Sequence, residues 1–238
     1  MKTYNGEKAI ISLTSWKARI NTVSKTLFSL VRRCPGFHIV LVLSEEEFPK
    51  KEKELPADVI ILTKNDLIEL CWVKRNYKSF KKVFFTMLKY PHVPIISADD
   101  DCLYKYNYAN ELYEQWLKNK KAVVSFYGSK WKDVFITGGY ATLYPPGLWT
   151  SHQKMVLPIL DNLPHILNYG DDPFYAVLNH ILHNTSYYII GKPMENVCAT
   201  HDANKPLHDT YKSLNRDTML LDIEHVITLA KYFITTKT

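Results

Sequence analysis

The segment Phe37–Leu43 is apolar along almost its whole length. A strand with one face in water alternates apolar and polar residues, so a continuous apolar run is typical of a strand covered on both faces. Further strands are predicted at 9–13, 58–62, 94–97 and 122–126, and helices at 22–31, 79–90 and 110–120. Because strands and helices alternate, we expect an α/β fold with a mostly parallel central sheet and helices on both faces.

The predicted strand at 94–97 runs almost directly into three consecutive carboxylates, Asp99, Asp100 and Asp101. Adjacent carboxylates repel one another, and a hard divalent cation with oxygen ligands would offset that repulsion. The alternative is a solvated turn, because Asp is a favoured turn residue. Side chains two residues apart on an extended chain point the same way, so Asp99 and Asp101 are expected to face one site, with Asp100 turned aside. The end of such a strand is also where open α/β sheets bind ligands.

The composition bounds the class of protein. A net charge of +6 on 238 residues suits an anionic ligand or an anionic membrane surface, and it is too modest to argue for nucleic acid. No apolar run approaches the roughly 18 residues of a membrane-spanning helix, and the polar start of the chain lacks the apolar region of a signal peptide. The four cysteines have no Cys-x-x-Cys spacing and are interpreted as reduced thiols. We therefore expect a cytoplasmic protein, with peripheral association at the inner face of a membrane as an open alternative.

After residue 126 the regular alternation ends. Residues 134–143 carry a Gly-Gly pair, which is typical of a strand that bends. A helix is predicted at 172–183 and a short strand at 187–190. An amphipathic helix is predicted at 213–233; packing against the core is the favoured interpretation of its apolar face, and docking to a membrane or partner is the alternative.

Six motifs follow one another along the chain: Ile11–Ile20, Leu43–Pro49, Ser79–Lys82, Lys89–Pro91 with Ser97–Asp101, Thr137–Gly139 with Leu143–Gly147, and Gly170–Asp172. Their order resembles that of the GT-A glycosyltransferases, and specifically a bacterial and viral group related to polysaccharide-building sugar transferases. The resemblance covers about residues 8–200. It implies a single GT-A (Rossmann-like) domain over 1–238, with a nucleotide-binding half at about 1–126, an acceptor and catalytic half at about 127–205, and a C-terminal helix at about 206–238.

The resemblance implies a nucleotide-sugar donor, most often UDP-linked, and a Mn²⁺ or Mg²⁺ ion. The ion would stabilise the negative charge that develops on the diphosphate as the sugar–phosphate bond breaks. Asp101 is the firmest of the implied metal ligands, Asp99 is a metal or ribose contact, and His201, from late in the chain, would complete the set. The implied acceptor is a hydroxyl of a glycan or glycolipid, in the synthesis of a surface polysaccharide such as capsule or lipopolysaccharide.

A larger set of residues is assigned to nucleotide-sugar binding by the same resemblance. The set comprises Thr14, Trp16, Arg19, Asp66, Lys81, Asp99, Asp100, Gly138 and Gly139.

Several members of this set have plainer interpretations. Arg19 could be a surface residue, and Asp66, placed after the predicted strand at 58–62, could cap a helix at 67–72 instead of binding uracil or ribose. Lys81 and Lys82 begin a predicted helix, where the helix dipole disfavours cations. This placement hints at a phosphate or base partner, although a solvated basic face is the common case.

The run Gly170-Asp171-Asp172-Pro173 opens the helix predicted at 172–183. One aspartate can act as the N-cap, since Pro is favoured at the first helical position. In inverting members of the resembling families an acid at this position takes the proton from the acceptor hydroxyl. We assign Asp172 as this general base and Asp171 as the alternate.

Two other classes of protein stay open. A nucleotidyltransferase also places carboxylates on an open α/β sheet, but it usually has a Gly-rich basic loop after the first strand, which residues 14–19 are not. A non-catalytic glycan-binding protein of the same fold would suit the 16 tyrosines and the basic charge.

Overall fold

The fold is described from a computed structural model. It describes residues 4–131, 134–137, 139–162, 170–183, 185–192 and 194–201, together with residues 224, 225, 227, 228 and 232. Those last five residues are helical, and the rest of the helix predicted at 213–233 lies outside the described residues, as does Gly138.

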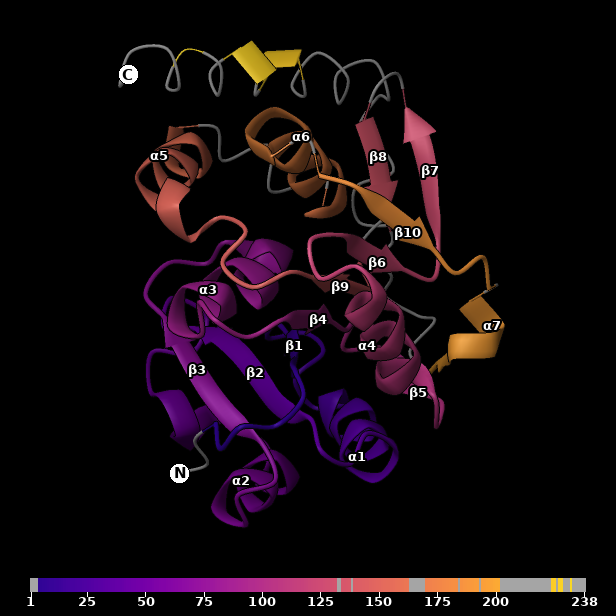
Figure 1. The fold of residues 1–238 in the computed structure, drawn as a ribbon. Coiled ribbons are helices and arrows are strands. Elements are labelled where there is room, and N and C mark those ends of the chain that lie inside the picture. Colours follow the sequence, from indigo (N-terminus) through magenta and orange to yellow (C-terminus); the bar gives the residue numbers. More distant parts are fainter. Residues whose placement is uncertain are drawn as a thin grey trace.

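A seven-stranded sheet forms the centre of the molecule (Figure 1). Its strand order is β10-β6-β9-β4-β1-β2-β3, and every neighbouring pair is parallel except those that involve β9. The bounds are β1 Ile10–Thr14, β2 His38–Ser44, β3 Glu69–Val73, β4 Ile95–Ser97, β6 Val123–Ser125, β9 Thr142–Tyr144 and β10 Tyr187–Ile189. The prediction of a mostly parallel α/β sheet is confirmed.

Helices cover both faces of this sheet, and each face has its own apolar core (Figure 1). On one face lie α1 Val23–Arg33, α2 Ala57–Lys64 and α4 Tyr108–Lys118; on the other lie α3 Lys81–Lys89, α5 Gln153–Asn162 and α6 Asp172–His183. Burial on both faces explains why the sequence of β2 is apolar along almost its whole length. Leu41 belongs to the first core, whereas Val40 and Val42 belong to the second, so both sets of alternating side chains are buried.

Two predicted elements between residues 57 and 73 are wrong, because their types are exchanged. The apolar run at 58–62 lies in helix α2, which follows Pro56 and buries Val59 and Leu62. The segment expected to be a helix at 67–72 instead forms edge strand β3, which pairs in parallel with β2. A short apolar run does not distinguish a strand from a buried helix segment, so the sequence pattern could not decide either segment.

Smaller elements complete the described part of the chain. Strands β5 Cys102–Tyr104 and β11 Cys198–Thr200 pair antiparallel, and so do β7 Gly128–Trp131 and β8 Val134–Thr137. The short helices are η1 Lys51–Glu54, η2 Lys78–Phe80, η3 Thr150–His152 and α7 Met194–Val197. Among the described residues, no helix combines the length and the apolar character needed to span a bilayer.

The order of the strands locates a crevice. From β1 the chain passes to β2 and β3 on one side, whereas β4, on the other side of β1, leads to the remainder of the sheet. Open α/β sheets bind ligands at such a point, at the carboxyl ends of the strands. Thr14 ends β1 there and Ser97 ends β4, so the acid run that follows β4 emerges beside the loop that follows β1.

Candidate active site

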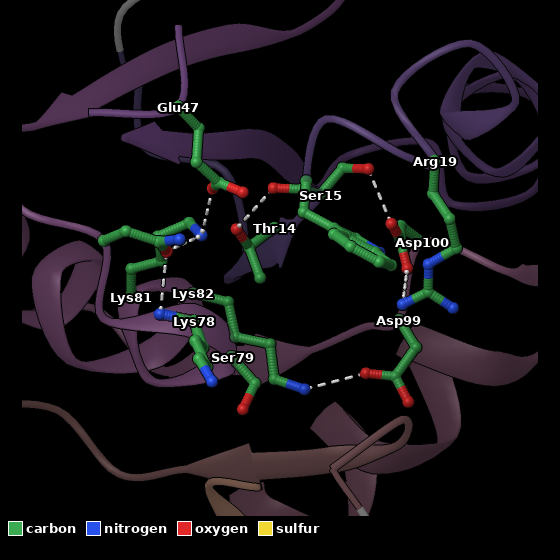
Figure 2. Close-up of a pocket in the computed structure, with 12 residues that line it drawn as sticks. Thr14, Ser15, Arg19, Glu47, Lys78, Ser79, Lys81, Lys82, Asp99 and Asp100 are labelled. Atoms are coloured by element: carbon green, nitrogen blue, oxygen red, sulfur yellow. Dashed lines mark hydrogen bonds and ion pairs between the residues drawn. The ribbon is translucent and has the colours of Figure 1, made fainter. Parts of the chain in front are cut away.

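A pocket enclosing about 600 Å³ of space, part of it open solvent, lies at this crevice (Figure 2). The loops after β1, β2 and β4 and the start of α3 form its wall. Six residues that the sequence assigned to nucleotide-sugar binding line it together: Thr14, Trp16, Arg19, Lys81, Asp99 and Asp100.

Arg19 pairs with two carboxylates of the acid run. Its guanidinium group lies 2.7 Å from Asp100 Oδ1 and 2.6 Å from Asp101 Oδ2, and the side chain is only 5% exposed. Ser15 donates a hydrogen bond of 2.6 Å to the other oxygen of Asp100, as Figure 2 shows. Burial raises the pKa of Asp100 to about 6, against the opposing effects of Arg19 and Ser15. Asp100 is therefore an internal anchor of the loop, and its interactions fix Arg19 against the pocket wall.

The expected geometry of the acid run needs correction. Asp99 and Asp101 were expected to share one site, but Asp99 pairs with Lys82 whereas Asp101 shares Arg19 with Asp100. The reason is local: Asp100 and Asp101 lie in a turn, so the alternation of an extended chain does not apply to them.

His201 lies beside the acid run, although it is distant in sequence. The pairing of β11 with β5 brings it there, and its backbone N–H donates to the carbonyl of Asp101 at 2.8 Å. Its Nε2 lies 2.9 Å from Thr26 Oγ1, and that hydroxyl donates to the Asp100 carbonyl. The backbone of the predicted ligand is thus adjacent to the predicted Asp ligands.

The side chains nevertheless do not form a metal site in this conformation. Among the residues that the structure describes, no three His, Cys, Asp or Glu side chains are grouped so that they could hold an ion. Arg19 and Lys82 already neutralise the carboxylates of the acid run. The donor set as arranged therefore does not fit a divalent cation, and the ligation by Asp99, Asp101 and His201 stays a prediction.

Lys82 connects the acid run to the start of α6. Its ammonium group lies 2.7 Å from Asp99 Oδ1 and 3.4 Å from Asp171 Oδ2, and its side chain is 3% exposed. Burial alone would lower the pKa of Lys82, but Asp171, Asp99 and Asp172 together raise it well above its usual value. A permanent buried cation thus joins two acidic segments from different parts of the chain.

The two aspartates at the start of α6 have different interactions, and one of them is the N-cap, as the sequence suggested. Asp171 precedes the first helical residue, and its carbonyl accepts the N–H of Tyr175, so Asp171 occupies the N-cap position. Asp172 Oδ2 accepts the N–H of Gly139 at 3.0 Å, and Oδ1 has no hydrogen-bond partner among the described residues. Burial and then the Asp171 carboxylate raise the pKa of Asp172 well above its usual value, against the effect of Lys82.

Gly139 makes the close approach of these groups possible. A Cβ atom at this position would lie 2.5 Å from Asp172 Oδ1 and 3.1 Å from Lys82 Nζ. The glycine therefore serves the packing of an acid and a cation, in addition to any approach to a sugar.

The opposite wall of the pocket contains two residues that the sequence analysis missed, Glu47 and Asn76. Lys81 Nζ lies 3.3 Å from Glu47 Oε2 and 2.9 Å from Asn76 Oδ1, and burial lowers the pKa of Lys81 against the effect of Glu47. The indole Nε1 of Trp16, on the same pocket, has no hydrogen-bond partner within the described part of the chain. Glu47 could have been found, because it follows the carboxyl end of β2, the neighbour of β1.

Asp66 lies elsewhere. It is exposed in the turn between α2 and the start of β3, with a φ of 53°, and it is not among the residues that line the pocket. The expectation that it follows a strand at the pocket edge is wrong, because that strand is helix α2.

Comparison with known proteins gives matches at the level of structure alone. No family model and no curated protein sequence matches the chain. A mannosyltransferase from Pyrobaculum calidifontis, solved in complex with GDP-Man and Mn²⁺, superposes with a TM-score of 0.52 and 13% identity, over 87% of this chain and 60% of that one. The chain has the GT-A fold.

Two further glycosyltransferase structures match this GT-A chain less closely. They are GlyE of Streptococcus pneumoniae TIGR4, with a TM-score of 0.44, 16% identity and coverage of 76% of this chain and 46% of that one, and GalNAc-T7 with UDP, GalNAc and Mn²⁺, with a TM-score of 0.41, 19% identity and coverage of 61% and 26%. The chain thus spans 60% or less of the length of each of the three matched chains.

Proposed function

We propose that this protein is a glycosyltransferase that transfers a sugar from a nucleotide sugar to a hydroxyl of a glycan acceptor. The observation that carries the proposal is the pocket at the carboxyl ends of β1 and β4. Its wall holds Trp16 and the polar group of Lys81, Glu47 and Asn76, and its far end holds Asp99, which Lys82 joins to the acid pair of α6. The GT-A fold supports the same reaction class, by analogy of fold.

The nucleotide would lie against the wall formed by Trp16, Lys81, Glu47 and Asn76. An indole ring offers a face on which a base can stack, and a carboxylate with a neighbouring amide can accept from and donate to the edge of that base. Lys78 and the hydroxyl of Ser79, which also line the pocket, lie on η2 and offer donors for phosphate oxygens. We propose a UDP-sugar as the donor.

The proposed chemical step uses Asp172 as the base; its Oδ1 is buried and has no hydrogen-bond partner among the described residues, and Asp172 does not line the pocket itself. The acceptor hydroxyl oxygen attacks the anomeric carbon, its proton passes to Asp172 Oδ1, and the bond from the anomeric carbon to the phosphate oxygen breaks with the electron pair leaving on the diphosphate. A raised pKa suits a base that must take up this proton at neutral pH. Direct displacement of this kind inverts the anomeric centre.

Three finer assignments belong to the same proposal. The acceptor would be a glycan or glycolipid of a surface polysaccharide, and the basic charge would suit work at the inner face of a membrane. Mn²⁺ or Mg²⁺ would bind at Asp99 and Asp101 with His201, and its chemistry there would be stabilisation of the leaving diphosphate. For that, Arg19 must first release Asp101, and Asp99 would offer the carboxylate oxygen that does not pair with Lys82.

The test combines binding with turnover. Thermal unfolding is measured with UDP-sugars and GDP-sugars, each with Mn²⁺ and with EDTA; a donor at 100 times its Kd should add about 2.7 kcal/mol to the free energy of unfolding. Release of nucleoside diphosphate from the stabilising donor then measures turnover. Asp172→Asn should keep the stabilisation and lose at least about 100-fold in turnover, as expected for a general base.

Other outcomes would contradict the proposal in distinguishable ways. Pyrophosphate released from a nucleoside triphosphate would indicate a nucleotidyltransferase. Stabilisation by a nucleotide sugar without turnover on any acceptor would indicate a binding protein of the same fold.

A further inference from the structure

Lys82 has surroundings that the predicted roles of the site do not explain. Its ammonium group is buried between Asp99, which follows β4, and Asp171, which precedes α6. Asp172 completes the acidic surroundings on the side of Gly139, since a Cβ at that glycine would touch both the Asp172 carboxylate and Lys82 Nζ. One cation therefore faces three carboxylates from two segments.

The backbone that carries Lys82 is fixed from two sides. Ser12 Oγ, on β1, donates to the Lys82 carbonyl and lies 2.7 Å from Thr86 Oγ1, so the first turn of α3 is held on the sheet. The hydroxyl of Tyr175, on α6, donates to the Phe80 carbonyl at 2.6 Å, and the ring of Phe80 packs edge-on against Phe174. The start of α3 and the start of α6 thus form one rigid corner.

We infer that Lys82 is a positioning residue for the proposed sugar transfer, on whose correctness the inference rests. Its ammonium group holds Asp99, on the donor side of the pocket, and Asp171, next to the proposed base, at a fixed separation. Asp172 follows Asp171 directly and accepts the Gly139 N–H, so fixing Asp171 also fixes the carboxylate that receives the acceptor's proton.

A direct role as a ligand of the donor's diphosphate fits the surroundings less well. Lys82 is 3% exposed, and its nearest partners are carboxylates that would repel an incoming phosphate. Lys78 and Ser79 offer donors at the pocket wall without an adjacent acid pair. The two roles predict different kinetics, because a phosphate ligand sets nucleotide affinity whereas a positioning residue sets the rate of the chemical step.

The test uses Lys82→Met, which keeps the length of the side chain and removes its charge. We expect turnover at saturating donor to fall about 100-fold, because displacement of a reacting group by about 1 Å costs this much. The Kd for UDP or GDP alone, measured by titration calorimetry, should change by less than about threefold. Lys82→Arg keeps the charge and should restore at least about a tenth of the wild-type turnover.

The matched control is Lys89→Met, on the same helix. Lys89 pairs with Glu69 at the amino end of β3, away from the carboxyl ends that form the pocket, so its loss removes a paired lysine from α3 without altering the pocket lining. This variant should keep wild-type turnover at saturating donor.

Three results of these measurements would overturn the inference, and the second variant below adds another. If Lys82→Met kept wild-type turnover, Lys82 would have no role in the transfer. If the nucleotide Kd rose by as much as turnover fell, Lys82 would be a phosphate ligand. No sugar transfer by the wild-type protein would defeat the proposed function itself, and the Lys82 assignment would fall with it.

A second variant covers the case in which Lys82→Met does not fold. Lys82→Met combined with Asp171→Asn removes one acid together with the cation, which lowers the uncompensated buried charge. Its turnover should lie at least about tenfold below that of Asp171→Asn alone, because Asp99 still loses its partner. Equal turnover in the two variants would overturn the inference.

Discussion

Arg19 shows how one buried side chain can decide the electrostatics of an acid run. It neutralises Asp100 and Asp101 at once, and Asp100 is only 3% exposed. Removing one partner of a buried ion pair leaves a charge without compensation, which is costlier than never having the pair.

We predict that Arg19→Met lowers the free energy of unfolding by about 3–5 kcal/mol, measured by urea denaturation near neutral pH. The control is Lys17→Met, since Lys17 is 66% exposed and pairs with Glu54 at 3.5 Å; the loss there should stay below about 1 kcal/mol. Equal effects in the two variants would mean that Arg19 contributes no more than a surface charge.

For single residues, the sequence predicted which residue types reach the site better than it predicted which side chains they contact. The acid run, the acid pair of α6 and the misplaced lysines at a helix start all reach the site. That Arg19 binds Asp100 and Asp101, and that Glu47 binds Lys81, depends on which loops meet in space. Sequence spacing carries no information on such contacts.

A second polar cluster lies at the amino ends of β2 and β3, whereas the pocket lies at the carboxyl ends of the strands. Glu69, at the start of β3, is 1% exposed and accepts hydrogen bonds from His38, Lys89 and Tyr90. Burial by itself would raise its pKa, but these three partners hold the pKa of Glu69 at about 2.

This gives a pH prediction with a definite sign. A carboxyl whose pKa is lower in the folded than in the unfolded protein stabilises the fold at pH values above the unfolded pKa of 4.5, and that contribution is lost as the pH falls toward 2. It amounts to about 3 kcal/mol at neutral pH, on an order-of-magnitude scale. Urea midpoints should therefore fall less steeply between pH 5 and about 2 in Glu69→Gln than in the wild type.

Glu45→Gln is the control for that measurement. Glu45 is 38% exposed and pairs with Lys51 on the surface, so its variant should follow the wild-type acid profile. A Glu69→Gln profile parallel to the wild type would contradict the proposed contribution.

The wrong predictions for α2 and β3 show what the spacing of apolar residues does not determine about secondary structure. Both segments are short and largely apolar, and each fits either structure locally. Residues 69–73 form a strand because they pair with β2 at the edge of the sheet. The sequence does not show that β2 has an unpaired side available for this strand. Long segments with clear helical spacing, such as those of α1 and α4, were placed correctly to within a few residues.

For the whole molecule, the central sheet joins the two halves inferred from the motifs. Within the part of the chain that the structure describes, β6 pairs with β9 and β10, both from the second half, and β9 also borders β4. The parallel part of the sheet was predictable from alternation of strands and helices. The insertion of antiparallel β9 was not, because this short strand lies between glycine and proline residues in a region without regular spacing.

We predict that a chain ending at residue 126 does not unfold cooperatively. It would leave β6 without sheet neighbours and would expose the apolar surface that α5 and α6 cover. Urea denaturation followed by near-ultraviolet circular dichroism measures this, with the full chain as reference. A sharp transition in the shortened chain would show instead that residues 1–126 fold independently.

The pairing of β11 with β5 has a consequence for the order of folding. It joins Asp101 to a residue about a hundred positions later, and contacts of such separation form slowly because a long loop must close first. The local turns and helices around β1 and β2 need no such closure. A nascent or refolding chain would therefore form the turns and helices around β1 and β2 before its acid run meets His201, so ligand binding at this corner would mark the end of folding and not its beginning.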